Sequence, residues 1–392
     1  MTVRRIDAAE RRARLVVRHR HVPSARTDDV VAIADDLVAL HSTDPVTVYL
    51  SVAARMRTPA LEPLAAALYD DRTLIRHHAM RRTLWVFGHD TARLAHHGAT
   101  LAVARVQRRD LLASLGASGV ADPQAWLAAA DEQVHALLAA EGPLTAREVG
   151  ARLPELTRPL TVGGGRFATT QAAHSRVLLV LGFTGRVVRA RPTGTWINGQ
   201  YRWAAADRWL PGGFGEADVR ESAAGLARRW LRAFGPGTRT DLAWWAGWTV
   251  ATTKAALADV GAVEVELDEG PGWVLPDDVD PVAPPEPSAR LLPGLDPSTM
   301  GWKQRAFHLD PDHVPLLFDR NGNGGPTLWV DGRIVGSWVQ RRDGAIATRL
   351  LTDVGAEAAA ELERHAHELE ALLGDVRFAV RDPAPVQAEL LA

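Results

Sequence analysis

The chain has 392 residues, a formal net charge of −2 and no cysteine. This length is enough for roughly two to four domains with well-buried cores. The lack of cysteine excludes disulfides and any cysteine-ligated metal or iron–sulfur site. No apolar run approaches the roughly 18 residues that span a bilayer, and Met1–Asp7 lacks the apolar stretch of a signal peptide. We therefore expect a cytoplasmic protein.

The first third of the chain predicts two helices followed by an extended pair. The helices are expected at Thr27–Leu40, with Thr27 as N-cap, and at Leu61–Asp70. The extended segments are expected around Leu74–His77 and Arg82–Phe87. A helix pair followed by two strands is the order of a winged helix.

His41, Thr43 and Asp44 form a polar cluster after the first of these helices. His41 continues the apolar three-and-four spacing, so we expect it at the C-terminus of the helix on its core-facing side. Pro45 ends the helix and biases Asp44 away from helical geometry. Two interpretations stay open. His41 is a core histidine that donates to a terminal carbonyl, or the cluster handles a water molecule and its proton.

Two later segments resemble each other. Residues 142–153 and 235–246 both read Gly-Pro-x-Thr, followed three positions after the threonine by an acid. Thr145 with Glu148, and Thr238 with Asp241, match the capping box that begins a helix. Each copy lies in a helix, turn, helix, helix, hairpin order, which predicts a repeated winged helix.

The elements around the two copies are predicted from their periodicity. For the first copy they are helices Leu127–Ala140 and Ala168–Gly182 and strands Arg186–Arg191 and Tyr201–Ala204. For the second copy they are helices Ala223–Phe234 and Val250–Ala258 and strands Val263–Leu267 and Gly272–Leu275. Gly163–Gly165 lies in the first copy and is interpreted as a loop, because no strand precedes it as in a phosphate-binding motif.

Pro276–Pro293 is rich in proline and is interpreted as an extended linker. After it the pattern predicts a small β-rich domain with a hairpin at Asp331-Gly332. The expected elements are strands Thr327–Val330, Arg333–Trp338 and Ala345–Leu351, a helix Ala356–Leu373, and a last strand Val376–Val380.

Several segments, in the same order, resemble the winged-helix DNA glycosylases of the AlkZ/YcaQ type. They are Leu37–Arg57, Arg81–Val86, Tyr201–Trp203, Asp207–Pro211, Phe234–Ala243, Leu291–Pro297 and Val330–Trp338. The resemblance implies an α+β fold of three tandem winged-helix modules followed by a β-rich C-terminal domain. We assign the modules to residues 1–124, 125–215 and 216–280, and the last domain to residues 281–392.

The resemblance also implies a function. Such enzymes hydrolyse the bond between a cationic N-alkylpurine, bulky genotoxin adducts included, and its sugar in DNA repair. Their usual motif is Gln-x-Gln or Gln-x-Asp, and here it reads His41-Ser42-Thr43. A neutral His41 would accept the proton of the water, Thr43 would hold that water, and Asp44 would stabilise positive charge on the sugar. The alternative is a non-catalytic DNA-binding protein that sequesters adducts or acts in regulation.

The expected partner is duplex DNA, alkylated, bound by a monomer without a metal or other cofactor. Arginines suit contacts with phosphate, and those in wing strands are the first candidates. The predicted DNA-contacting residues are Arg55, Arg81, Arg82, Arg189, Arg191 and Arg202.

Overall fold

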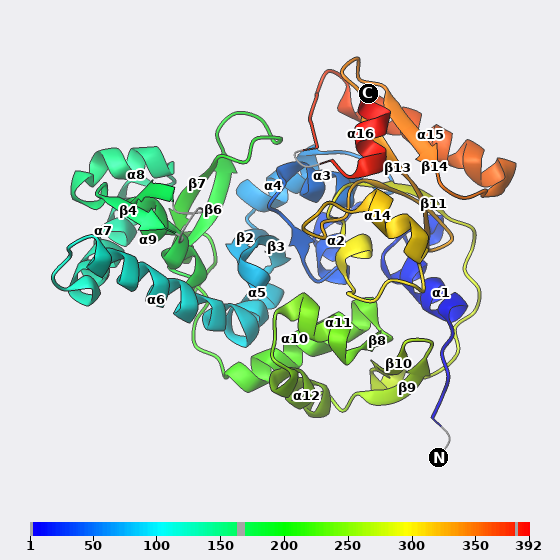
Figure 1. Cartoon of the computed structure of the whole chain (residues 1–392), viewed down its shortest axis with the longest axis horizontal. Coiled ribbons are helices and arrows are strands. Elements are labelled where there is room, and N and C mark those ends of the chain that lie inside the picture. Colours follow the sequence, from blue (N-terminus) through cyan, green and yellow to red (C-terminus); the bar gives the residue numbers. More distant parts are fainter. Residues whose placement is uncertain (1–2, 163–168, 381–382) are drawn as a thin grey trace. The chain divides into compact units, whose positions relative to one another are not determined.

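The computed structural model describes residues 3–162, 169–380 and 383–392. The Gly163–Gly165 run therefore lies outside the described residues. The chain divides into two compact units (Figure 1), which we call the larger and the smaller unit. The larger unit comprises Met1–Ala65 and Ala224–Ala392, and the smaller unit comprises Ala66–Ala223. The chain passes between them within helices α4 (Glu62–Tyr69) and α10 (Val219–Phe234).

The smaller unit combines helices with short antiparallel strands. Strands β3, β2, β6 and β7 lie next to one another in that order, and β4 pairs with β5 in a separate hairpin. The strands are β2 (Leu74–His78), β3 (Leu84–Gly88), β4 (Pro159–Val162), β5 (Thr169–Ala172), β6 (Val187–Pro192) and β7 (Tyr201–Ala205). The helices are α5 (His89–Ala95), α6 (Leu101–Ala117), α7 (Pro123–Glu141), α8 (Ala146–Arg152) and α9 (Ala173–Phe183).

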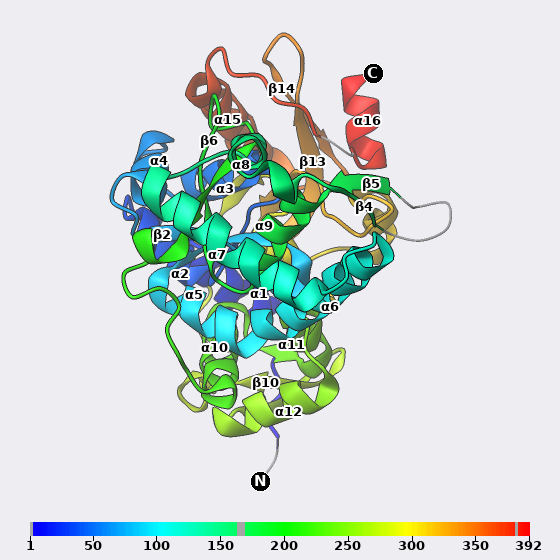
Figure 2. The same ribbon diagram turned by 90° about the vertical axis from the view of Figure 1, so that its left-hand side faces the viewer.

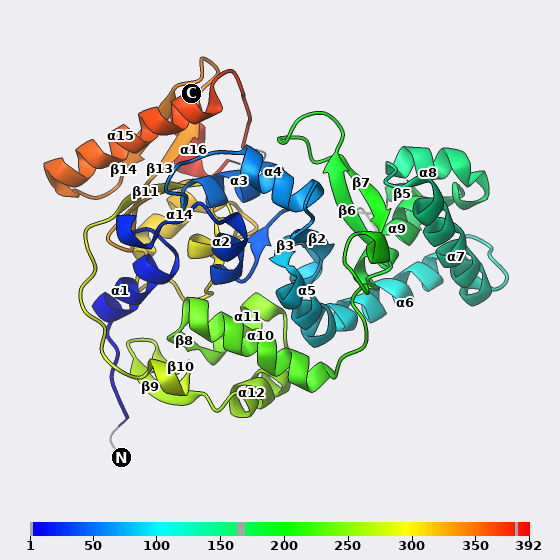
Figure 3. The ribbon, with the colours of Figure 1, turned by 180° about the vertical axis from the view of Figure 1, so that it is seen from behind.

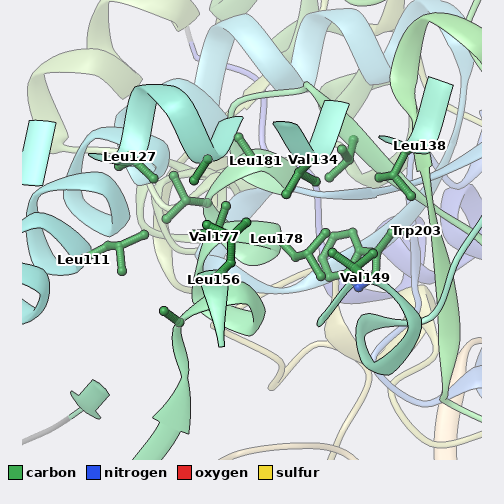
Figure 4. Close-up of a cluster of buried hydrophobic side chains, with 14 of the residues drawn as sticks. Leu111, Leu127, Val134, Leu138, Val149, Leu156, Val177, Leu178, Leu181 and Trp203 are labelled. Carbon is green, nitrogen blue, oxygen red and sulfur yellow. The ribbon is translucent and has the colours of Figure 1, made fainter. Parts of the chain in front are cut away.

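The core of the smaller unit lies among α6, α7 and α9. Leu111 of α6, Val134 of α7 and Val177 of α9 are at most 1% exposed, and Trp203 of β7 closes the cluster (Figure 4). Figure 2 shows α6 and α7 side by side within this unit. Burial of this apolar surface provides the main stabilisation of the unit.

The larger unit begins with three helices and a short strand. These are α1 (Ala8–Arg18), α2 (Val30–Asp36), β1 (Leu40–His41) and α3 (Pro45–Ala53). The second stretch of the unit contains α11 (Arg239–Ala246), α12 (Val250–Asp259) and a sheet in the order β8-β10-β9. Those strands are β8 (Gly237–Thr238), β9 (Val263–Leu267) and β10 (Gly270–Val274).

The C-terminal part of the larger unit is an antiparallel sheet in the order β11-β12-β13-β14. Its strands are β11 (Ala289–Leu292), β12 (Thr327–Val330), β13 (Arg333–Gln340) and β14 (Ile346–Leu350). The accompanying helices are α13 (Pro297–Met300), α14 (Val314–Leu317), α15 (Gly355–Leu373) and α16 (Pro385–Leu391). Helix α15 packs against β11 and β14, as Figure 3 shows from behind.

Both predicted capping boxes are present. The Thr145 hydroxyl accepts from the Glu148 amide at the start of α8, and Thr238 accepts from Asp241 at the start of α11. Each acid side chain bonds back to the backbone of its threonine. The predicted Asp331-Gly332 hairpin is also confirmed, because both residues have positive φ (47° and 76°), as the tight turn requires.

Several predicted elements are wrong. Thr169–Ala172 is strand β5 rather than helix, because the β4–β5 hairpin precedes α9. Ala289–Leu292, assigned to the linker, is strand β11 and pairs with β12. Val376–Val380 is not a strand. Instead, the side-chain amide of Gln340 donates to the carbonyl of Val376 and accepts from the amide of Phe378, so a side chain takes the place of a neighbouring strand.

The fold is thus a mixed α+β arrangement with several small antiparallel sheets. The number of winged-helix modules and the boundaries of the four predicted domains stay predictions. None of the helices that the structure describes combines the length and the apolar character needed to cross a membrane.

Candidate active site

The polar cluster lies at the junction of β1 and α3 in the larger unit. His41 ends the two-residue strand β1 and is 6% exposed, whereas Thr43 is exposed and Asp44 is half-buried. The predicted helix Thr27–Leu40 stops at Asp36, with Asp29 rather than Thr27 as its N-cap. Val38 has a positive φ of 62°, a backbone turn that a helix cannot contain. The expectation that His41 sits at a helix C-terminus is therefore wrong.

Asp44 is the N-cap of α3, a helix that the sequence analysis missed. Its backbone is extended, Pro45 takes the first helical position, and its carboxylate accepts from the Val46 amide at 3.0 Å. Proline is favoured at the first helical position, because a backbone N–H there would have no acceptor within the helix. A carboxylate at a helix N-terminus is favoured by the partial positive charge of the helix end. A negative charge is thus held within three residues of His41.

Helix α3 is fixed to the segment Leu291–Pro297. The Thr47 hydroxyl donates to the Gly294 carbonyl at 2.7 Å, and the Ser51 hydroxyl donates to the Asp296 carboxylate at 2.6 Å. Two segments far apart in the sequence, both of which carried the family resemblance, therefore meet at this helix. Its residues from Pro45 to Ala53 are all buried, which leaves α3 little freedom to move.

Arg55 is enclosed by the protein and is not presented to a ligand at its surface. It is 0% exposed and forms a bidentate ion pair with Asp296, with both N–O distances 2.8 Å. Its remaining donors reach the carbonyls of His19 and Ser51 and the hydroxyl of Ser298. The prediction of Arg55 as a phosphate contact is wrong, because every donor is used inside the protein.

Asp296 is a functional-site neighbour that the sequence analysis missed. It is 0% exposed, yet it stays ionised: burial alone would raise its pKa, but the charge and hydrogen bonds of Arg55 outweigh burial and hold that pKa below its ordinary value. Its position before Pro297 is a helix-start pattern, and it does cap α13. The sequence signals for it were that pattern and its place in the segment Leu291–Pro297, which carries the family resemblance.

The other predicted DNA contacts lie in the smaller unit. Arg81 and Arg82 form the turn between β2 and β3, and both have positive φ (56° and 61°). Arg82 is exposed, whereas Arg81 is half-buried, and burial lowers its pKa. Two adjacent arginines in strained backbone at a hairpin tip match the tip of a wing, which commonly meets the DNA backbone.

The arginines of β6 and β7 differ from one another. Arg189 packs its guanidinium 3.4 Å from the ring centre of Trp203 and donates to His78, and burial lowers its pKa to about 9. Arg189 is half-buried with its guanidinium engaged by Trp203 and His78, and its contact with DNA stays a prediction. Arg191 is exposed and pairs with Asp70 at 2.7 Å, and Arg202 is half-buried. Arg82 and Arg191 stay the best candidates.

Comparison with known proteins identifies the family. The family profile described as "DNA glycosylase AlkZ-like" matches residues 34–372. The chain belongs to the AlkZ-like DNA glycosylase family. The AlkZ-like match extends over most of both units and includes the His41–Asp44 cluster. As a member of this family the protein is an enzyme, a hydrolase, and its substrate is DNA.

Structural comparison agrees with the AlkZ-like assignment. The DNA glycosylase AlkZ of Streptomyces sahachiroi has the same fold, with a TM-score of 0.74 and 20% sequence identity. The alignment covers 94% of this chain and 98% of that one. No curated protein sequence matches the chain.

Proposed function

We propose that this AlkZ-like enzyme hydrolyses the N-glycosidic bond of cationic N-alkylpurines in duplex DNA. The observation that carries the proposal is the β1–α3 junction, where an aspartate held at a helix N-terminus lies beside a histidine and an exposed threonine. These groups supply a negative charge, a proton acceptor and a water-binding hydroxyl within four residues. We also propose that the enzyme acts as a monomer in the cytoplasm.

The reaction asks for little acid catalysis. The water oxygen bonds to C1′ of the sugar, the bond from C1′ to the purine nitrogen breaks, and its electron pair neutralises the cationic base. In our proposal Thr43 orients the water, His41 accepts one of its protons, and the Asp44 carboxylate stabilises the positive sugar in the transition state. The products are the free base and an abasic site.

We expect Asp44→Asn to lower base release by about 10²–10³-fold, because it removes the charge that stabilises the transition state. Asparagine caps helices as well as aspartate, so the thermal midpoint should stay unchanged. The measurement is release of 7-methylguanine from methylated duplex DNA. Asp29→Asn is the matched control, because Asp29 caps α2 in the same way. Equal rates for the two variants would remove Asp44 from the mechanism.

His41→Gln tests the proton acceptor. We expect a lower rate at neutral pH with an unchanged thermal midpoint, because an amide does not accept a proton from water. The exposed His367→Gln serves as control. An equal or higher rate in His41→Gln, which restores the usual first residue of the family motif, would eliminate His41 as an essential base.

Base release has to be distinguished from binding of the adduct alone, because the motif reads His-x-Thr in place of Gln-x-Gln. The same assay separates the two. Tight binding to DNA with N7 adducts, combined with no base release from methylated or bulky substrates, would establish sequestration instead.

Binding to duplex DNA should weaken as salt rises, despite the net charge of −2. For Arg82→Ala we expect the slope of log affinity against log salt to become shallower by about 0.9, as for one lost phosphate contact. Arg342→Ala is the control, an exposed arginine in the β13–β14 turn. An unchanged slope in Arg82→Ala would place the β2–β3 turn away from DNA.

A further inference from the structure

The larger unit contains a cavity of about 540 Å³ where α3, α15 and the C-terminal sheet meet. Its apolar wall includes Leu50 and Ala53 of α3, Leu291 of β11, Trp338 of β13 and Leu372 of α15. Small-molecule sites are commonly cavities of roughly 300–1,000 Å³ with largely apolar walls and a few placed polar groups. This cavity has the size and the wall of such a site.

The polar groups of the cavity are mainly cationic. Arg26, Arg57, Arg290 and Arg364 all line it, whereas Glu368 is the one carboxylate among its lining residues. Glu368 does not balance this excess, because it already bonds to Arg364 and to His365.

Arg290 is the central cation. It is 3% exposed, and among the residues that the structure describes it has no carboxylate partner, while its Nε and Nη2 have no hydrogen-bond acceptor. Its Nη1 bonds to the Ala289 carbonyl and to Nε2 of His365. A buried arginine is normally paired, because an isolated charge is poorly solvated inside a protein.

His365 does not neutralise Arg290 either. Burial is the largest cause that lowers the pKa of His365, against the raising effect of Glu368 and Glu361. Its Nδ1 lies 2.9 Å from the Glu368 carboxylate, and its Nε2 lies beside Nη1 of Arg290 and 3.2 Å from the Glu361 carboxylate. The arrangement orients Arg290 without cancelling its charge, and Arg26 and Arg57 add two further positive charges.

We propose that this cavity binds a small organic anion, a carboxylate or sulfonate on an apolar ring or chain. The apolar wall would bury the body of the ligand, and Arg290 with the neighbouring Arg57 and Arg26 would attract its charge. Inorganic phosphate fits less well, because it has no surface to place against Leu291, Trp338 and Leu372.

The cavity is distinct from the candidate active site. Asp44 caps the N-terminus of α3, whereas Leu50, Ala53 and Ala54 line the cavity from the C-terminal end of the helix. Leu50, the first of these lining residues, lies six residues along the helix from Asp44, about 9 Å. Binding at the cavity and base release can therefore be measured independently, and failure of one proposal leaves the other standing.

The test uses two fluorescent probes with one aromatic skeleton, anilinonaphthalene sulfonate and the neutral phenylnaphthylamine. We expect one-to-one binding of the sulfonate to the full-length protein, about tenfold tighter than binding of the neutral probe. Arg290→Met should weaken binding of the sulfonate by about tenfold and change the affinity for the neutral probe by less than about twofold. Leu372→Trp, which fills the cavity, should abolish binding of both.

Arg342→Met is the matched control and should bind both probes as the wild type does. If Arg290→Met does not fold, Arg57→Met at the exposed rim replaces it, with the same selective loss expected. Equal affinity for the two probes would refute the anion site. Binding unaffected by Leu372→Trp would place the probes elsewhere on the protein and overturn the proposal. If inorganic phosphate displaced the sulfonate as effectively as an aromatic carboxylate does, the site would bind simple anions. The proposed contribution of the apolar wall would then be refuted.

Discussion

Replacing Asp296 by alanine is expected to lower the free energy of unfolding by about 3–5 kcal/mol. The change leaves the Arg55 guanidinium buried at 0% exposure without its bidentate partner. It also removes the acceptor of the Ser51 hydroxyl and the cap of α13. Urea unfolding at neutral pH measures the loss.

The matched control is Asp122→Ala, which removes an exposed N-cap from α7 and, among the residues that the structure describes, breaks no ion pair. It should cost about 0.5–2 kcal/mol, the usual range for a lost cap. In the double variant Arg55→Met/Asp296→Ala the stranded charge is gone, so part of the stability should return. A loss in Asp296→Ala no larger than in Asp122→Ala would contradict a stabilising role for this buried pair.

This pair shows why only part of the site could be predicted from the sequence. Arg55 and Asp296 are 241 positions apart, and no local pattern connects them. Read locally, Arg55 is an arginine following an apolar stretch, and such arginines are usually exposed. Only the fold reveals that it is buried and paired.

Elements with local causes were predicted well. The capping boxes at Thr145 and Thr238 and the turn at Asp331-Gly332 depend on residues within a few positions, so the sequence is sufficient. The end of α2 was missed because Val38 adopts a positive φ that its side chain disfavours, and surrounding structure imposes it. The roles of His41, Thr43 and Asp44 stay a hypothesis, since chemistry is not readable from position alone.

Lowering the pH from 7 to 5 is expected to destabilise both units. Several histidines are buried, and burial is the largest cause holding their pKa values far below the ordinary 6.5. They are His19, His21 and His308 in the larger unit and His77, His78 and His96 in the smaller unit. Below pH 6.5 these histidines bind protons in the unfolded chain but stay neutral in the folded protein. The free energy of unfolding is therefore highest above pH 6.5 and falls as the pH drops toward the pKa values of the folded protein.

The size of the effect follows from the two histidines with pKa values of about 3, His19 and His96. At pH 5 protonation of each of these two histidines in the unfolded chain lowers the free energy of unfolding by about 2 kcal/mol. The other four buried histidines act in the same direction. Since domains are stable by about 5–15 kcal/mol, we expect unfolding to begin between about pH 6 and pH 5. Urea midpoints measured from pH 7.5 to 5 test this before the carboxylates titrate.

His308→Phe is the decisive variant. His308 is 2% exposed, stacks on Trp329, and neither ring nitrogen has a hydrogen-bond partner among the residues described. Phenylalanine keeps the stacked ring and removes the proton site, so the loss of stability between pH 7 and pH 5 should be smaller than in the wild type. The exposed His367→Gln should leave the pH dependence as in the wild type. A pH profile that His308→Phe does not flatten would mean that this ring already carries its proton in the folded protein.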